Sequence, residues 1–393
     1  MANKYELRGV SATKSEVHEA IKGMDKGLYP NAFCKILPDV MAGDPDFCNI
    51  MHADTAGTKT SLAYLYWRET GDLSVWEGIV QDALVMNLDD MGCVGAVSDV
   101  LISSTIGRNK RLIPAEVLKT IIQGAKQFVD QMAEAGVDLH LTGGETADVG
   151  DIVRTIDVGY TTFARLRRDR LVVNDIQAGM VGVSLASYGQ TTYESAYNSG
   201  MGSNGLTSAR HDVLNHLYAE KYPESFETEL PREVVYQGSK LLTDTIDIDG
   251  QSITVGKLIL SPTRTYLPFL KQLLSDQHNL LPHIGGIIHC SGGGQTKVVK
   301  FLDKVRVVKD KLPPAPPLFQ LIREESGTSL KEMYQVFNMG QRLEVFLPEA
   351  HAQTVIDLAR SFKIDASVTS YVEAAEQAEV RIVSEEGTFD YPE

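Results

Sequence analysis

The sequence has few cysteines, no long apolar run and no excess of positive charge, and each absence excludes a class of protein. The four cysteines among 393 residues are scattered without zinc-site spacing, so we expect reduced thiols rather than disulfides. No apolar run approaches the roughly 20 residues that a membrane helix requires, and no apolar segment follows the charged N-terminus. We therefore expect a cytoplasmic protein without a membrane partner.

Positive charge is also scarce, since the net charge is −15. This balance argues against a nucleic-acid-binding protein, although it allows local contacts with phosphorylated metabolites. At 393 residues the chain is too long for one typical core, so two domains are expected. The charge-rich run from Arg165 to Arg170 has the character of a solvated connector, and we place the boundary there, between domains 1–168 and 169–393.

The phosphate-binding loop Gly-x-x-x-x-Gly-Lys-Ser/Thr is missing, so an ATP site would belong to another class. Gly200, Gly202 and Gly205 have the glycine spacing of the dinucleotide-binding motif Gly-x-Gly-x-x-Gly. The polar residues 190–199 separate them from the preceding strand, so NAD binding is not favoured. Ser203 or Asn204 as the cap of a helix running to residue 217 explains this stretch better.

What is present is a series of polar segments at the ends of predicted strands and helices. Asp54 to Thr60 joins a strand to a helix, and a helix start offers free N–H groups to phosphate. Lys59 could meet phosphate oxygens and Asp54 could hold a metal. An ordinary polar loop is an equally acceptable interpretation of this stretch.

Two further acidic segments could likewise be either a metal or ligand site or an ordinary polar segment. Asp89 and Asp90 end a predicted helix, where negative charge is unfavourable unless it faces solvent or binds a cation. Gly143 and Gly144 would let the backbone approach a ligand closely, and Glu145 beside them could hold a metal.

Apolar periodicity predicts helices alternating with strands, which is typical of a mixed α/β fold. The expected helices cover residues 15–28, 62–67, 76–91, 114–135, 262–275 and 348–362. The expected strands cover residues 47–51, 95–105, 137–141, 152–163, 179–186, 284–288, 343–347, 367–372 and 380–383, with a hairpin at 246–255. Arg264 is a possible phosphate contact, whereas His289 and Cys290 are interpreted as structural.

Together these blocks resemble the aminoimidazole ribonucleotide synthetase family, the phosphoribosylformylglycinamidine cyclo-ligases. The segment from Asp54 to Lys59 resembles the family's Asp-Gly-Val-Gly-Thr-Lys, and Gly143 to Ala147 is its Gly-Gly-Glu-Thr-Ala. The remaining matches are Leu88 to Met91 (family Val-Asn-Asp-Leu), Ser203-Asn204-Gly205, Pro262-Thr263-Arg264, Gly292-Gly293-Gly294, Glu332-Met333-Tyr334 and Phe337-Asn338-Met339-Gly340. The resemblance extends from about residue 8 to about residue 348.

The resemblance implies an α/β protein of two domains that closes the imidazole ring of formylglycinamidine ribonucleotide with ATP and Mg²⁺. It also implies a homodimer, joined through the N-terminal sheets with the ATP site near the seam. The residues implied as catalytic are Asp54, Lys59 and Asp90, and those implied as metal ligands are Asp54, Asp89, Asp90 and Glu145. The residues implied in substrate or nucleotide contacts are Gly57, Thr58, Gly143, Gly144, Thr146, Ser203, Asn204, Arg264 and Asn338.

The chain departs from the family at several positions. Gly202 stands where the family has a histidine before Ser-Asn-Gly, and residues 189–201 include an insertion. Two alternatives therefore remain open, another ATP-dependent kinase or synthetase of the same scaffold and a nucleotide-binding regulator without turnover.

Overall fold

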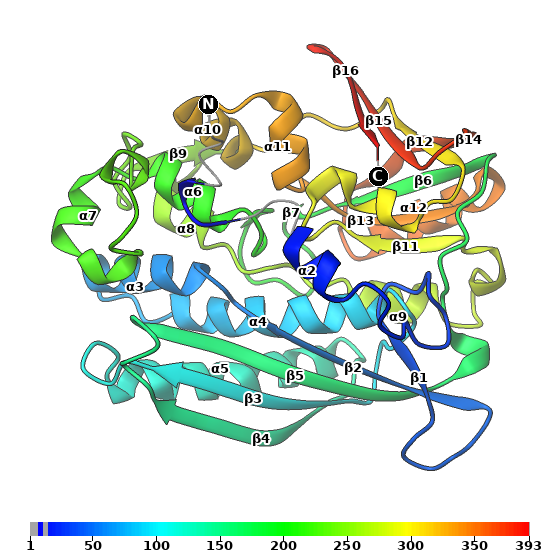
Figure 1. Ribbon diagram of the computed structural model, residues 1–393, viewed down its shortest axis with the longest axis horizontal. Coiled ribbons are helices and arrows are strands. Elements are labelled where there is room, and N and C mark those ends of the chain that lie inside the picture. The colour runs from blue at the N-terminus through cyan, green and yellow to red at the C-terminus, as the bar shows by residue number, and fades with distance from the viewer. Residues whose placement is uncertain (1–6, 11–14, 393) are drawn as a thin grey trace.

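The chain folds around two β-sheets with helices between and around them, as the computed structural model in Figure 1 shows for residues 7–10 and 15–392. The first part contains α2 (Ser15–Ala20), β1 (Ile36–Pro38), β2 (Phe47–Thr55), α3 (Lys59–Thr70), α4 (Val75–Gly92), β3 (Val100–Arg108), α5 (Ala115–Glu134), β4 (Leu139–Asp148), β5 (Ile156–Arg167) and the 3-10 turn η1 (Arg168–Arg170).

The middle of the chain contributes mostly short elements. These are β6 (Met180–Ala186), β7 (Tyr188–Gly189), β8 (Asn198–Ser199), α6 (Leu206–Val213), α7 (Leu217–Lys221), η2 (Pro223–Ser225), η3 (Arg232–Val234), β9 (Thr245–Ile248), β10 (Gln251–Thr254), α8 (Val255–Ile259), α9 (Leu267–Leu273) and η4 (Leu281–His283). The last part contains β11 (Gly286–His289), η5 (Gly294–Phe301), β12 (Val305–Lys309), α10 (Pro317–Ser326), α11 (Leu330–Val336), β13 (Gln341–Pro348), η6 (Glu349–His351), α12 (Ala352–Ser361), β14 (Ala366–Ala374), β15 (Glu379–Ser384) and β16 (Gly387–Pro392).

The first sheet has five strands in the order β1-β2-β5-β3-β4. All neighbours are antiparallel except β3 and β4, which are parallel. Helices α4 and α5 pack against one face, where Ile50 and Ile102 are buried. The opposite face carries exposed Met51 and Leu101. Because side chains alternate along a strand, this sheet has one core face and one open face.

The second sheet has seven strands in the order β11-β13-β6-β14-β12-β15-β16. Helix α12 packs on β6 and β14, and α9 joins α12 to α4. Helix α4 thus lies between the first sheet and the C-terminal half of the chain (Figure 1). The mixed α/β fold expected from the sequence is confirmed.

The two sheets follow one another in the sequence, since β5 ends at Arg167 and β6 begins at Met180. The apolar core is not divided at the same point of the sequence as the sheets. Its largest cluster joins Leu84 of α4 to Leu258 of α8 and Leu318 of α10. The division at residues 168/169 therefore stays a prediction.

Several predicted boundaries are wrong for identifiable reasons. The helix expected over 15–28 ends at Ala20, because Gly23 and Gly27 adopt positive φ angles of 84° and 83°, which interrupt an α-helix. Its expected apolar face is not buried either, since Ile21 and Met24 are exposed. The helix expected to reach residue 217 ends at Val213, and a separate short helix, α7, follows it.

The glycine-rich segment 142–148 is part of strand β4 rather than a loop after it. The hairpin expected at 246–255 is confirmed, since Ile248 pairs with Gln251 across Asp249 and Gly250, both with positive φ. All four cysteines are buried and free. Within residues 7–10 and 15–392, we find no helix with the length and apolar character needed to span a bilayer.

Candidate active site

Helix α4 organises the candidate site because it is buried on nearly every side yet carries several polar residues. Asp82, Asn87 and Asp89 are fully buried, and Asp90 is 9% exposed. Buried carboxylates require partners. Their partners come from the segments that the sequence analysis had singled out as motifs, so α4 brings these segments together.

Asp82 accepts a 2.8 Å hydrogen bond from Lys59 Nζ. The Lys59 ammonium also donates to the backbone oxygens of Gly202 (3.0 Å) and Ser261 (2.6 Å). An ammonium has three donors, so all three are used within the chain. Burial lowers the pKa of Lys59, and the negative charge of Asp82 opposes this shift.

The expected contact between Lys59 and phosphate oxygens does not fit this arrangement, because the side chain is fully buried and its donors are occupied. Lys59 instead joins three segments at their meeting point. The Asp82 carboxylate extends this junction, since it also accepts from the backbone N–H and the hydroxyl of Thr263, at 2.7 and 2.6 Å.

Asp89, one of the expected metal ligands, holds the start of α9. It accepts hydrogen bonds from the Thr265 hydroxyl at 2.7 Å and from the Tyr266 backbone N–H at 3.0 Å. Burial raises its pKa from the ordinary value. In this arrangement its oxygens are engaged by the protein, which suits a structural role, and its assignment as a metal ligand stays a prediction.

Asp90 lies between two histidines. His289 Nδ1 is 2.6 Å from its Oδ1, and His52 Nε2 is 3.5 Å from its Oδ2. His52 Nδ1 in turn lies 3.0 Å from Asn87 Oδ1. Among the described residues, no group hydrogen-bonds to the buried Nε2 of His289. His289 was interpreted as structural from the sequence, and its full burial beside Asp90 agrees with that interpretation.

Asp54 lies two residues beyond His52 on β2, a distance of about 7 Å along a strand. Its carboxylate accepts from the Thr55 backbone N–H at 2.7 Å. A second carboxylate, Asp157 on β5, lies within its electrostatic reach. The pKa of Asp157 is raised, mainly by burial and further by the negative charge of Asp54. Asp157 nevertheless faces the other side of the sheet, because it lies two residues from Gly159, which pairs with Thr55, the neighbour of Asp54. The two carboxylates therefore do not form one metal site.

Glu145 does not join this group within one chain. It pairs with Thr105, which pairs with Gly159, which pairs with Thr55, so Glu145 and Thr55 lie three strand spacings apart, about 14 Å. Thr55 also faces the side of the sheet opposite to Asp54, because neighbours in a strand alternate. The part of the chain that the structure describes contains no cluster of three or more His, Cys, Asp or Glu residues suited to a metal ion.

The position of the family's missing histidine is occupied from elsewhere. A Cβ atom on Gly202 would lie 3.0 Å from Arg342 Nη1. Arg342 is 2% exposed, lies over the Tyr266 ring with 5.5 Å to its centroid, and donates through Nη2 to the backbone oxygen of Arg264. Its Nε and Nη1 are buried, and neither contacts an acceptor among the described residues. Such donors suit an anion.

The segments on either side of Gly202 are fixed internally. Asn338 donates to the backbone oxygens of Gly200 and Met201 at 2.9 and 3.2 Å, and its own oxygen accepts from Ser187 and Gly340. Asn338 therefore holds this turn, and its expected contact with nucleotide stays a prediction. The residue that precedes α6 is Gly205, which lacks a side-chain cap, so neither Ser203 nor Asn204 caps that helix.

Ser203 lies against the same junction, with its hydroxyl 3.0 Å from that of Thr263. Asn204 lies near the glycine turn, since a Cβ on Gly292 would be 3.7 Å from its Nδ2. Both remain candidate contacts to a ligand. The buried guanidinium of Arg264 is engaged by Glu194, at 2.7 Å, and by the backbone oxygens of Ala186 and Tyr188. Its expected phosphate contact does not fit this arrangement and stays a prediction.

The remaining candidate residues are more exposed. Gly57 and Thr58 precede α3 and are exposed, and the Thr58 hydroxyl is 3.1 Å from that of Thr207. Gly143, Gly144 and Thr146 lie on β4 with Glu145, at the edge of the first sheet. Their roles in binding stay predictions, and they lie apart from the junction around Lys59.

Sequence reasoning missed Asp82 and Arg342, and it did not identify Asp90 as the partner of His289. Only Asp82 had a readable signal, because Asp82 and Asp89 are seven residues apart on an apolar helix and so share one face. The partners of Arg342 and His289 depend on tertiary packing that the linear pattern does not contain.

Comparisons with known proteins agree with the motif resemblance. Residues 37–166 match the family model described as AIR synthase related protein, N-terminal domain. A phosphoribosylformylglycinamidine cyclo-ligase of Methanocaldococcus jannaschii is 27% identical over 329 residues, which are 83% of this chain and 79% of that protein. The resemblance to this family drawn from the motifs is thus confirmed.

Two solved structures share the fold. T. maritima PurL complexed with FGAR superposes with a TM-score of 0.54 at 14% identity, and the alignment covers 97% of this chain and 50% of that one. This chain therefore spans about half the length of PurL. Thiamine monophosphate kinase from Aquifex aeolicus superposes with a TM-score of 0.51 at 11% identity, over 95% of this chain and 96% of that one.

Proposed function

We propose that this chain catalyses the ATP-dependent cyclisation of formylglycinamidine ribonucleotide to aminoimidazole ribonucleotide, a step of purine biosynthesis that releases ADP and phosphate. One structural observation supports the proposal independently of the named relatives. Segments that match the family's motifs, far apart in the sequence, meet around α4 through Lys59, Asp82, Thr263 and Asp90.

The reaction needs activation of a poor leaving group. The γ-phosphoryl of ATP is transferred to the formamide oxygen, giving an iminophosphate and ADP. An amidine nitrogen of the same molecule then attacks that carbon, phosphate leaves with the former formamide oxygen, and the imidazole ring closes. Because attack and leaving group share one molecule, the protein mainly positions the reactants and neutralises charge.

Two side chains of this site suit those tasks. Arg342 has N–H groups without an acceptor among the described residues. Such groups suit the oxygens of a phosphoryl group during its transfer. His289, hydrogen-bonded to Asp90 through Nδ1, is fully buried and orients that carboxylate. In this proposal Arg342 takes the place of the histidine that is absent at position 202.

The proposed Mg²⁺ ligands are Asp54 and Asp90, since Asp54 lies on the same face of β2 as His52, whose Nε2 is 3.5 Å from Asp90 Oδ2. The ion, when bound, would neutralise triphosphate charge. Carboxylate oxygens on β2 and α4 suit this ion.

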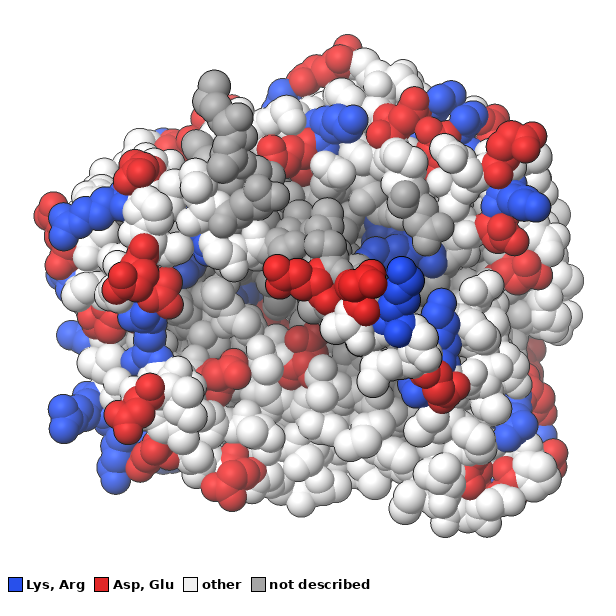
Figure 2. All heavy atoms as spheres, viewed as in Figure 1, with Lys and Arg blue, Asp and Glu red and all other residues white. Residues whose placement is uncertain are grey.

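Glu145 contributes to this site only if a second copy of the chain brings it there, in keeping with the homodimer that the family resemblance implies. The open face of the first sheet supports this arrangement. Met51 pairs with Phe163, which pairs with Leu101, and the surface over these strands, in the lower part of Figure 2, carries few charged side chains. An apolar sheet face of this kind is typical of a protein–protein interface.

A direct assay tests the proposal. The full chain is incubated with formylglycinamidine ribonucleotide, ATP and Mg²⁺, and ADP, phosphate and aminoimidazole ribonucleotide are quantified together. We expect the three products in equal amounts. A phosphorylated product that persists would instead identify a kinase of the same scaffold.

One observation favours a second candidate, a nucleotide-binding regulator without turnover. Lys59 has no donor left for phosphate, and Arg342 fills the space in front of Gly202. Saturable ATP binding without release of any product would support this second candidate and overturn the first.

A further inference from the structure

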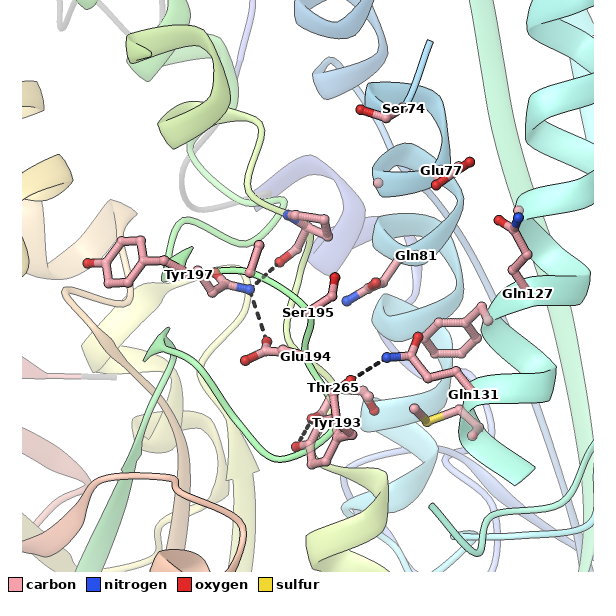
Figure 3. A pocket seen from close by; sticks show the side chains of 17 residues that line it. Ser74, Glu77, Gln81, Gln127, Gln131, Tyr193, Glu194, Ser195, Tyr197 and Thr265 are labelled. Carbon is pink, nitrogen blue, oxygen red and sulfur yellow. Dashed lines mark hydrogen bonds between the residues drawn. The ribbon is translucent and has the colours of Figure 1, made fainter. Parts of the chain in front are cut away.

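A cavity of about 240 Å³ lies between helices α4 and α5 and the segment 193–198 (Figure 3). The residues proposed for catalysis do not line it, and Thr265 of the lining connects it to α4, since its hydroxyl donates to Asp89. The segment 193–198 falls within the insertion at residues 189–201, so the cavity is built by a part of the chain that the family resemblance does not explain.

The wall formed by this segment is held firmly in place. The Tyr193 hydroxyl donates to the backbone oxygen of Thr265 at 2.7 Å. Glu194 accepts from Arg264 at 2.7 Å, and Asn198 donates to the backbone oxygen of Pro262 at 2.7 Å. These bonds tie the segment to residues 262–265. The cavity is therefore formed without a ligand, as binding sites usually are.

The lining presents hydrogen-bond acceptors. Gln81 donates through Nε2 to the backbone oxygen of Thr263 at 2.8 Å, and Gln131 donates through Nε2 to the backbone oxygen of Tyr193. Each amide thus keeps its carbonyl oxygen as an acceptor, and Gln127 and Glu77 line the same cavity (Figure 3).

The charge and the aromatic side chains of the lining restrict the class of ligand further. No lysine or arginine is found among the described residues of the lining, so a phosphate or carboxylate would meet acceptors and the Glu77 carboxylate without a counter-charge. Phe128 and Tyr193 supply aromatic surface, against which a planar ring packs well.

We propose that this cavity is a second binding site, for a planar nitrogen heterocycle that bears an amino group and no phosphate, a compound of the nucleobase class. The amino and ring N–H groups donate to the free amide oxygens and to Glu77, while the ring packs on the aromatic side chains. The site binds its ligand independently of the nucleotide proposed for the reaction.

Isothermal titration calorimetry of the full chain with adenine tests this site, in the presence of saturating ATP and Mg²⁺ so that the proposed reaction site is occupied. We expect one adenine per chain. Hypoxanthine, in which a carbonyl replaces the amino group, should bind at least about tenfold more weakly, because its oxygen would face acceptors.

Substitutions in the lining test whether adenine binds in this cavity. Gln127→Leu should weaken adenine binding about tenfold by removing one polar contact, and Ser195→Trp should abolish it by filling the cavity. Gln123→Leu is the matched control, since Gln123 is an exposed glutamine on the same helix outside the lining, and it should bind adenine as the unaltered chain does. Melting temperatures near that of the unaltered chain verify folding.

The proposal is overturned if adenine does not bind, if hypoxanthine binds equally well, or if Gln127→Leu and Ser195→Trp bind adenine like Gln123→Leu. These outcomes are independent of whether the chain closes an imidazole ring.

Discussion

At the scale of single residues, Lys59 separates two interpretations of the same motif. Sequence reasoning assigned it to phosphate, whereas the structure places it in a buried ion pair with Asp82. Breaking a buried pair leaves an uncompensated charge and costs about 3–5 kcal/mol. Lys59→Met should therefore lower the free energy of unfolding by this amount, measured by urea denaturation.

The matched control is Lys126→Met, which removes an exposed lysine paired with Asp130 and should change stability by no more than about 0.5 kcal/mol. A Lys59→Met chain as stable as the original but unable to bind ATP would restore the phosphate interpretation.

Gly202 and Arg342 form a second residue-scale test because they share one space. Gly202→His should destabilise the protein, since position 202 has a φ of 70° and the new side chain meets the guanidinium. Arg342→Ala frees this space. We therefore expect Gly202→His to cost at least about 0.5 kcal/mol less in the Arg342→Ala background than alone.

A double-mutant cycle of urea denaturation measures this coupling. Strictly additive effects would show that Arg342 does not occupy the space of the missing histidine.

At the scale of elements, an ion pair ties β5 to Asp39, the residue that follows β1. Arg165 donates two hydrogen bonds to Asp39 Oδ2, at 3.0 and 2.9 Å, and these bonds lower the pKa of Asp39 to about 2. A carboxyl whose pKa is lower in the folded state stabilises that state above its unfolded pKa, about 3.9. This stabilisation is lost as the pH falls from about 4 through about 2.

Asp39→Asn should therefore reduce the loss of stability between pH 5 and pH 2.5, values chosen to bracket the transition. Asp169→Asn is the control, because Asp169 pairs with Arg167 at an exposed site and contributes less. Chemical denaturation at both pH values measures the effect, and identical slopes for Asp39→Asn and the original chain would refute it.

The helices and strands also show how much of the structure could be predicted from the sequence. The α4 helix and the β2 strand follow from apolar periodicity, and the motifs placed Asp54 and Asp90 near the same helix–strand seam. The partners of Lys59 could not be predicted, since two of its three acceptors lie 143 and 202 residues away. The glycines at 143 and 144 suggested a loop, but pairing with β3 holds this segment as a strand.

At the scale of the whole molecule, the open face of the first sheet predicts dimerisation. Leu101→Glu should place a charge on this face and yield a monomer in size-exclusion chromatography with light scattering, because burying an unpaired carboxylate in an interface is unfavourable. Ile122→Glu is the control, since Ile122 is an exposed apolar residue on α5, which packs on the other side of the sheet. A Leu101→Glu chain that remains a dimer would contradict this interface.

The central claim is that acidic residues along α4 and β2 support ring closure with ATP, and Asp54 tests it most directly. The measurement is the rate of aminoimidazole ribonucleotide formation by Asp54→Asn, beside its melting temperature. The account predicts turnover reduced at least about 100-fold, as for loss of a group that stabilises transition-state charge, with a melting temperature near that of the original chain. Equal turnover of the two chains, or loss of turnover matched by loss of folding, would contradict it.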